Sequence, residues 1–406
     1  MAKKMNTKSS GGSIFDIVKS IDDTAEILSE SATAVIEDYV NTGSYIVNAA
    51  MTGSLFRGVP TGRVVCFAGD PGTGKSYLAL SICREGQKKG YTPIYMDSEG
   101  SIDKEFVERI GCDSSKMIIK QVSTISEVST FMVNILNEIN DKPKEDRPKV
   151  IFVLDSLGNL SSTKELSDTA DGNGKADMTK AREAKALFRT TTTAIAKAQA
   201  LFLVNTHTYD TQEMFSRKIA TGGKGLSFNA SITLMLSTSK LDDKQSDKIA
   251  EKKVGDFTKT GVVVTAKPEK SRFTIPQRVR FQIPFFKAPN PYVGLEPYIT
   301  WENSGILRGK IITEKEYSKL SDSEKLLCHE IKDQKDNKCY AYPKDTSKNI
   351  VVKHLGCEVP VTDMFTSKVL TDEILHNLDE TVIKPNFELP SNESNNDIEE
   401  LLCIDE

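Results

Sequence analysis

One segment of the sequence combines the residue types needed to bind the phosphates of a nucleotide. Residues 69–76 read Gly-Asp-Pro-Gly-Thr-Gly-Lys-Ser, which fits GxxxxGK followed by Ser or Thr, with an apolar run before it and a helical pattern after it. The glycines let backbone N–H groups wrap phosphates at a helix N-terminus, Lys75 reaches the outer phosphates, and the Ser76 hydroxyl can coordinate Mg²⁺. The sequence therefore predicts an ATP and Mg²⁺ site made of Gly69, Asp70, Pro71, Gly72, Thr73, Gly74, Lys75, Ser76 and Tyr77.

Two later apolar runs end in carboxylates that could complete this site. The run VIFVLDS places Asp155 at its C-terminal end, where a Walker B carboxylate of a P-loop NTPase holds Mg²⁺ through water. The run TPIYMDSE places Asp97 and Glu99 at the mouth of another strand, and we expect Glu99 to orient or deprotonate the attacking water. The alternative for Glu99 is an ordinary surface carboxylate. Together these residues predict Mg²⁺-dependent ATP hydrolysis.

An α/β core is expected to position these side chains. Beyond Gly58, short apolar runs alternate with helical stretches, which is typical of a mainly parallel, twisted sheet covered by helices on both faces. Residues 239–260 carry dense charges of both signs and predict an exposed hairpin end or loop. The expected strands are RVVCFAG, TPIYMDSE, KMIIK, KVIFVLDS, ALFLVNT, ASITLML and GVVVTAK, and the expected helices cover residues 77–89, 103–110, 125–139 and 178–199.

The ends of the chain differ in character from this core. Apolar residues recur at helical spacing from Ile14 to Leu28, and the pattern extends to Tyr39; this helix either packs on its own core or serves as a docking arm for a neighbouring subunit. From about Trp301 the periodicity is mixed. We therefore expect an N-terminal tail and helical oligomerisation segment (1–40), an ATPase core (41–300), a small C-terminal domain (301–388) and an acidic, disordered tail (389–406).

Composition limits the classes of function. The 406-residue chain has a net charge of −4, which by itself does not indicate nucleic-acid binding, although much of the negative charge lies in the tail. No apolar run is long enough to span a membrane and no signal peptide is visible, so we expect a cytoplasmic protein. The seven cysteines include no CxxC pair, and the spacings of Cys328, His329, Cys339, His354 and Cys357 match no common zinc module.

The order of the motifs resembles the RecA family of recombinases. The resemblance rests on NTGSYIVNAA, GDPGTGKS, MDSEGSIDKEFVERIGCD and FVLDSLGNL, and it covers roughly residues 40–285. The stretches DMTKAREAKALFR and NTHTYDTQEMFSRKIATGGKGLSFNAS closely resemble the UvsX branch of that family, which tailed phages carry.

The resemblance implies a RecA-like P-loop ATPase core and a function in DNA. It implies an ATP-dependent recombinase that self-assembles into helical filaments on single-stranded DNA and pairs it with a homologous duplex, in recombination, repair and recombination-dependent replication. The partners to expect are these DNAs and a mediator or single-strand-binding protein, in the cytoplasm of a phage-infected bacterium. A RecA-core hexameric helicase and a regulatory paralogue without strand exchange remain the alternatives.

Two loops are implied to bind DNA, at residues 161–177 and 208–225. Both are predicted from their composition to be mobile. The second combines basic charge, a flexible Gly-rich backbone and aromatic rings, which suits a groove for single-stranded DNA, although a merely solvated basic loop is the alternative. The implied DNA-binding residues are Lys164 and Lys175 in the first loop and Tyr209, Phe215, Arg217, Lys218, Gly222, Gly223 and Lys224 in the second.

Three further residues receive roles from the resemblance. His207 stands where the family places a polar sensor of the γ-phosphate, whereas the alternative is an ordinary hydrogen-bonded histidine. Lys270 and Arg272 match a basic pair that reaches across the subunit interface to the neighbour's ATP and assists catalysis. For this pair the alternative is a solvated strand end.

Overall fold

The main body of the protein is built on one large sheet. The eight strands follow the order β12-β11-β10-β3-β7-β6-β4-β5. Strands β10, β3, β7, β6, β4 and β5 pair in parallel, and β11 and β12 run antiparallel at one edge. The strands are β3 (Val64–Gly69), β4 (Thr92–Asp97), β5 (Ile118–Gln121), β6 (Val150–Asp155), β7 (Leu201–Thr206), β10 (Ile232–Thr238), β11 (Gly261–Ser271) and β12 (Val279–Pro284).

The computed structural model describes most but not all of the chain. The described residues are 13–22, 25, 27–28, 31, 33–170, 179–210, 218–220, 223–238, 261–284 and 289–389. Among them no helix is long and apolar enough to cross a membrane. The segment 239–260, predicted as a hairpin end or loop, lies outside the described residues, as does most of the acidic tail.

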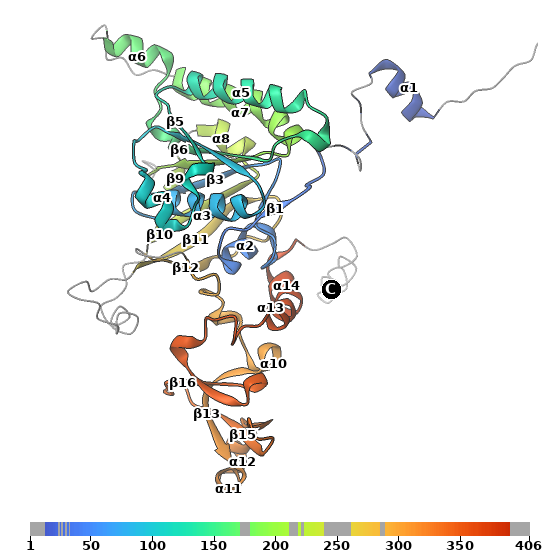
Figure 1. The fold of residues 1–406 in the computed structure, drawn as a ribbon, viewed down its shortest axis with the longest axis vertical. Helices are drawn as coiled ribbons and strands as arrows, with labels where there is room; N and C mark the ends of the chain where they lie inside the picture. The colour runs from blue at the N-terminus through green and yellow to red at the C-terminus, as the bar shows by residue number, and fades with distance from the viewer. Residues whose placement is uncertain are drawn as a thin grey trace, which may run out of the picture.

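Helices cover both faces of the large sheet (Figure 1). Strands β3, β6 and β7 are buried at every position because each face of the sheet meets a helical layer. Each face has its own apolar cluster. One face carries α2 (Tyr45–Thr52), α3 (Lys75–Lys88) and α4 (Lys104–Ile110), and the other carries α5 (Ile125–Asn140), α7 (Thr179–Ala198) and α8 (Gly223–Asn229). The predicted α/β fold is confirmed.

The N-terminal helix is shorter than predicted. Helix α1 (Ile14–Ile21) begins at a capping box on Ser13, and the described residues after Asp22 form no further turn of it. The expected extension to Tyr39 is wrong, because Tyr39–Val40 form strand β1, which pairs with β2 (Val59–Pro60). Side chains of the main body bind the carbonyls of this segment instead: Arg63 donates to Thr33 and Ala34, and Gln199 donates to Val35.

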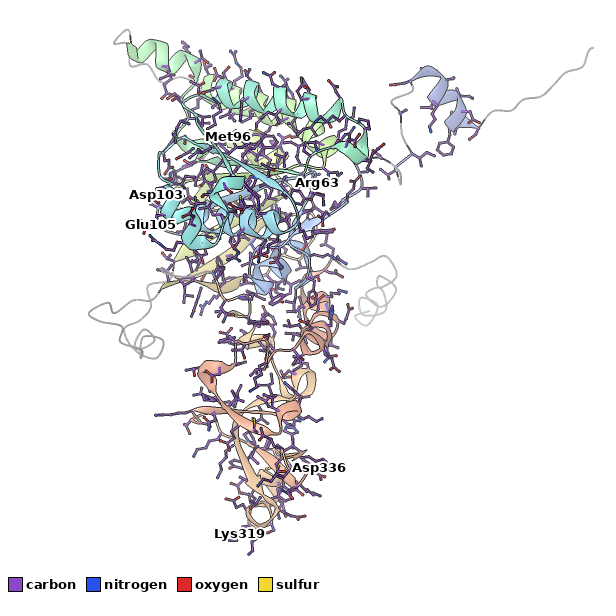
Figure 2. All side chains as sticks on the ribbon, viewed as in Figure 1. Arg63, Met96, Asp103, Glu105, Lys319 and Asp336 are labelled. Carbon is purple, nitrogen blue, oxygen red and sulfur yellow. The ribbon has the colours of Figure 1, made fainter. Side chains whose placement is uncertain are left out.

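A second, slimmer unit extends from the main body and contains a five-stranded antiparallel sheet in the order β14-β15-β13-β16-β17. Lys319 and Asp336 lie at its far end, well away from Met96 in the large sheet (Figure 2). Its elements are α10 (Trp301–Ser304), β13 (Ile306–Thr313), α11 (Glu314–Tyr317), α12 (Asp322–Lys325), β14 (His329–Lys332), β15 (Lys338–Pro343), β16 (Asn349–Val352) and β17 (Cys357–Pro360). The exact domain boundaries stay a prediction.

The last helices return to the main body and tie the two units together. Helices α13 (Asp372–Leu378) and α14 (Lys384–Phe387) are joined by a π-helical turn, and Leu378, Ile383 and Phe387 enter the apolar cluster of the main body. The carboxylate of Asp379 is 2% exposed. It accepts hydrogen bonds from the Ser54 hydroxyl and the Leu55 N–H, both at 2.7 Å.

Removing the Asp379 carboxylate is expected to destabilise this junction. Asp379→Ala leaves two buried donors without an acceptor and should lower the free energy of unfolding by about 2–3 kcal/mol. The measurement is urea unfolding followed by circular dichroism and by the fluorescence of Trp301, the single tryptophan of the chain. Glu373→Ala, at an exposed carboxylate of α13, serves as the control and should change stability by about 0.5 kcal/mol or less. Equal effects of both substitutions would contradict the assigned role of Asp379.

Candidate functional site

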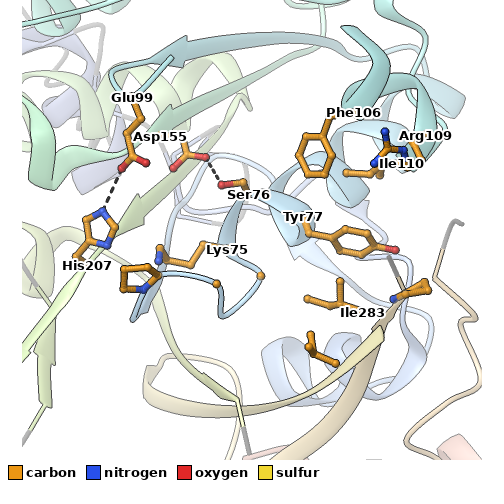
Figure 3. Close-up of a pocket in the computed structure, with 15 residues that line it drawn as sticks. Lys75, Ser76, Tyr77, Glu99, Phe106, Arg109, Ile110, Asp155, His207 and Ile283 are labelled. Carbon is orange, nitrogen blue, oxygen red and sulfur yellow. Dashed lines mark hydrogen bonds and ion pairs between the residues drawn. The ribbon is translucent and has the colours of Figure 1, made fainter. Parts of the chain in front are cut away.

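A cavity of about 330 Å³ opens where the parallel strands β3, β4, β6 and β7 end. Predicted residues from four segments line it: the loop after β3, the turn after β4, the end of β6 and the end of β7. Figure 3 shows Glu99 and His207 on one side and Phe106, Ile110 and Ile283 on the other, with Lys75 and Ser76 between them. Because the carboxyl ends of parallel strands meet at one edge, residues far apart in the sequence share this cavity.

The phosphate loop adopts the conformation that its glycines allow. Gly72 and Gly74 have left-handed φ angles of 76° and 88°, and a Cβ on Gly74 would approach Ile283 to 2.0 Å. Helix α3 starts at Lys75 and no side chain caps its N-terminus, and the partial positive charge of such a terminus favours an anion. The Lys75 ammonium donates to the carbonyls of Gly69 and Asp70, at 2.9 and 3.0 Å, and burial lowers its pKa. These features fit nucleotide phosphates.

Asp155 lies beside the start of α3 and is 2% exposed. Its Oδ2 accepts hydrogen bonds from the Ser76 hydroxyl at 2.6 Å and from the Tyr95 hydroxyl at 2.5 Å. On the next strand, Asn205 follows Val204, the residue that pairs with Leu154 just before Asp155. Asn205 is fully buried, and its amide atoms have no hydrogen-bond partner among the described residues. A buried amide of this kind is ordinarily satisfied by water or ligand, which fits a hydrated Mg²⁺ next to Asp155.

Glu99 is held in place by three segments. The buried carboxylate of Asp97 accepts the N–H groups of Glu99 and Gly100, both at 2.9 Å, and so fixes the turn after β4. Glu99 Oε1 accepts a hydrogen bond from the Ser156 hydroxyl at 2.7 Å and lies 3.1 Å from His207 Nε2. Glu99 is therefore an oriented carboxylate in the cavity, and Asp97 acts on it through the backbone.

The segment after β7 connects this site to the second predicted DNA loop. Directly after His207, the Thr208 hydroxyl donates to the Asp70 carboxylate of the phosphate loop at 2.6 Å. Strand β8 (Thr208–Asp210) begins there and pairs with β9 (Lys218–Ala220). The phosphate loop and the β8–β9 hairpin are thus in direct contact.

The apolar side of the cavity was not predicted from the sequence. Phe106, Arg109 and Ile110 of α4 line it, together with Val262 of β11 and Ile283 of β12. The available signal was the helical pattern directly after Glu99, since a helix that follows a strand at this edge must pass beside the phosphate loop. The apolar lining suits the base of a nucleotide.

The two predicted DNA loops contain regular structure. Helix α6 (Thr163–Ala170) lies in the first, and it begins with reciprocal hydrogen bonds between Ser162 and Glu165, a capping pattern readable in the sequence. Helix α8 begins at Gly223 in the second, after the hairpin. The segments predicted as mobile loops thus contain helices in part, and their role in binding DNA stays a prediction.

The DNA-binding residues predicted within these loops are placed only in part. The side chains of Lys164 and Tyr209 are exposed. Lys218 belongs to β9, and Gly223 and Lys224 belong to α8, where the structure describes the backbone. The remaining predicted residues, Lys175, Phe215, Arg217 and Gly222, lie outside the described residues.

Lys270 and Arg272 do not line the cavity of their own subunit. Lys270 pairs with Thr233 near the start of β10, whereas the phosphate loop adjoins Leu236 near the end of that strand. The basic pair therefore lies toward the opposite edge of the sheet from the phosphate loop. The Lys270 ammonium donates to the carbonyl of Phe228 at 3.0 Å.

In the part of the chain that the structure describes, no group of three or more His, Cys, Asp or Glu side chains is arranged to hold a metal ion. Cys328 donates to the carbonyl of Glu324, and His329 stacks on Trp301 with ring centroids 4.7 Å apart. These cysteine and histidine side chains therefore have structural contacts of their own.

Comparison with known proteins identifies the family. The model of the RecA N-terminal domain matches residues 14–276, more than half of the chain. The chain belongs to the RecA family. The recombination and repair protein of Enterobacteria phage T4 is 30% identical over 261 residues, which cover 64% of this chain and 62% of the phage protein. Protein RecA of Agrobacterium fabrum is 27% identical over 240 residues, covering 58% of this chain and 61% of that protein.

A third relative, Protein RecA of Rickettsia canadensis, is 28% identical over 229 residues, covering 53% of this chain and 62% of that protein. The chain thus matches about three fifths of the length of these relatives. The predicted resemblance to the RecA family, including its phage branch, is confirmed. Members of this family are DNA-dependent ATPases that use ATP and Mg²⁺.

Phe106→Ala is expected to weaken nucleotide binding. Stacking of a base on an aromatic ring contributes about 1–3 kcal/mol, so the dissociation constant for ATP should rise about tenfold. The measurement is titration with a fluorescent ATP analogue in the presence of Mg²⁺. Phe365→Ala, which removes a ring of the C-terminal unit outside the cavity, is the control and should bind normally. Unchanged binding by Phe106→Ala would show that the base lies elsewhere.

Proposed function

We propose that the protein is an ATP-dependent recombinase that forms filaments on single-stranded DNA and catalyses homologous pairing and strand exchange. The observation that carries this proposal is the contact between the nucleotide site and the β8–β9 hairpin. The consecutive residues His207 and Thr208 touch Glu99 and Asp70, and the hairpin begins at Thr208. Binding or hydrolysis of ATP is thus expected to alter the contacts at the start of the segment that would hold DNA.

Each residue of the cavity then has a defined task in ATP hydrolysis. The phosphate loop and Lys75 bind the phosphates, and Ser76 and Asp155 would hold Mg²⁺, which neutralises phosphate charge when bound. Glu99 orients or deprotonates the attacking water, because its carboxylate is fixed by Ser156 and by the turn at Asp97. His207 exchanges its contact with Glu99 for one with the γ-phosphate and so reports the nucleotide state to the hairpin.

The DNA is held mainly through its backbone and the faces of its bases. Basic residues of the two loops neutralise phosphates, and Tyr209, which is 51% exposed, offers a ring for stacking. These contacts are largely independent of the DNA sequence. Homology is therefore tested by base pairing between the single strand and the duplex. The other contributors are Lys164, Lys175, Phe215, Arg217, Lys218, Gly222, Gly223 and Lys224.

Assembly into a filament follows from two exposed apolar surfaces. Helix α1 stands away from the main body, and its Ile14, Phe15 and Ile21 are 64%, 57% and 80% exposed. Strand β5 is the outer strand of the large sheet and exposes Ile118 and Ile119, on the other side of the body from α1 (Figure 1). Docking of α1 onto β5 of the next subunit is head-to-tail, and such contacts generate open helices unless the rotation closes a ring.

This arrangement also gives Lys270 and Arg272 a partner. Their distance along the sheet from the phosphate loop of their own subunit supports a role at the nucleotide of an adjacent one. A cation contributed by a neighbour ties hydrolysis to assembly, since ATP then stabilises the interface and its hydrolysis weakens it.

Two alternatives share the same ATP site. A hexameric helicase would form closed rings and unwind duplexes, and a regulatory paralogue would use ATP only to switch assembly. The relatives named as RecA and as a recombination and repair protein favour the recombinase. The phage relative also favours a role in the cytoplasm of an infected bacterium, with a mediator or single-strand-binding protein as loader, in recombination, repair and recombination-dependent replication.

Strand exchange tests the proposed activity. With ATP and Mg²⁺, the protein should convert a circular single strand and a homologous linear duplex into joint molecules, visible by gel electrophoresis. Lys75→Ala removes the cation that reaches the phosphates, and this variant should form no joint molecules. DNA-stimulated ATP hydrolysis without joint molecules would contradict the proposal and favour a helicase or a regulatory paralogue.

Charging the apolar face of α1 should prevent assembly. The double substitution Ile17→Glu, Ile21→Glu introduces two negative charges where docking requires apolar contact, and sedimentation velocity with ATP and single-stranded DNA should show mostly small species. Lys19→Glu changes the net charge by the same amount on the polar face and is the matched control. Equal assembly of the two variants would show that α1 is not the docking arm.

A further inference from the structure

One buried tyrosine hydroxyl reaches the nucleotide site from inside the core. Tyr95 belongs to β4 and has no exposed surface. Its ring is part of the apolar cluster between the sheet and α3, together with Leu78 and Cys83 of that helix. A polar atom at this depth requires a partner, because a buried hydroxyl without a hydrogen bond costs free energy.

The partner of this hydroxyl is the Walker B carboxylate. Tyr95 lies opposite Val153 in the parallel pairing of β4 with β6, two residues before Asp155 on the same side of the sheet. The hydroxyl donates to Asp155 Oδ2 at 2.5 Å, and the Ser76 hydroxyl donates to the same oxygen at 2.6 Å. One carboxylate oxygen is therefore held by two donors, from the core side and from the cavity side.

The two donors are not equivalent. Ser76 lines the cavity and follows Lys75 in the phosphate loop, so its hydroxyl oxygen is the one that could coordinate Mg²⁺. Tyr95 does not line the cavity and cannot leave the core without disrupting the packing around it. Of the two donors that the structure shows on Oδ2, Tyr95 is therefore the one whose position does not depend on what occupies the cavity.

We propose that Tyr95 is a positioning residue, whose hydroxyl fixes the Asp155 carboxylate in the orientation that receives the hydrated Mg²⁺ of the nucleotide complex. The hydrogen bond holds Oδ2 from the core side, so that the carboxylate would keep one orientation toward the hydrated ion. Residues that orient a ligand in this way commonly change metal affinity or activity by about 10–100-fold when removed. The inference rests on the proposed ATP and Mg²⁺ site.

Tyr95→Phe tests this role because it removes one oxygen and keeps the ring. Binding of a fluorescent ADP analogue is titrated with Mg²⁺, and the same analogue is titrated in EDTA. The Mg²⁺ concentration for half-maximal binding should rise about tenfold in the variant, whereas affinity in EDTA should stay unchanged. The Mg²⁺ dependence of ATP hydrolysis should shift in the same direction.

Tyr91→Phe is the matched control. The Tyr91 hydroxyl also donates from a buried ring to a carboxylate, that of Asp38 at 3.1 Å, but neither residue lines the nucleotide cavity. It should leave the Mg²⁺ dependence unchanged, and circular dichroism melting should show that both variants fold.

The possible results test the role of Tyr95 separately from the proposed ATP and Mg²⁺ site. A half-maximal Mg²⁺ concentration within twofold of the wild type in folded Tyr95→Phe overturns the role of Tyr95, as does an equal loss of affinity in EDTA, which indicates general damage. Wild-type protein that binds the analogue without any dependence on Mg²⁺ overturns the proposed ATP and Mg²⁺ site itself.

Discussion

The parallel pairing of β4 with β6 is the constraint on which the rest of the site depends. It sets Asp97 directly opposite Asp155, so that acidic side chains gather at one edge of the sheet. Carboxylates in such a place are stable only if donors or cations surround them. Hydroxyls and backbone N–H groups donate to these carboxylates, with Tyr95 on the core side of Asp155 and Ser76 on its cavity side.

From this edge, two polar contacts lead to the segment expected to bind DNA. Glu99 meets His207, and Asp70 meets Thr208, at 3.1 and 2.6 Å. Because His207 and Thr208 are consecutive and β8 begins at Thr208, the proposed function expects rearrangement of either contact on nucleotide binding to shift the start of the hairpin. The phosphate loop and Glu99 are thus connected to the segment predicted to bind DNA through two side-chain pairs.

The sequence predicted the core well because its signals are strong and local. Each expected strand exists, since fully buried parallel strands read as continuous apolar runs, as VIFVLD shows for β6. Lys75, Ser76, Glu99, Asp155 and His207 meet in one cavity, as strand ends at a common edge must.

Features that depend on tertiary contacts escaped prediction. The extension of α1 failed because Arg63 and Gln199 bind the backbone carbonyls of residues 33–35, a contact that no helical periodicity encodes. The role of the Tyr95 hydroxyl could not be predicted from the apolar run that contains it, because its partner Asp155 lies 60 residues away in the chain. The apolar side of the cavity, including Ile283 of β12, likewise depends on how distant strands pair.

Electron microscopy of the protein with single-stranded DNA and a slowly hydrolysed ATP analogue tests the central claim, that subunits join head-to-tail around a shared nucleotide to form a recombinase. Head-to-tail assembly around a shared nucleotide predicts open helical filaments that follow the DNA and are absent without nucleotide. Closed rings of fixed subunit number under the same conditions would contradict it.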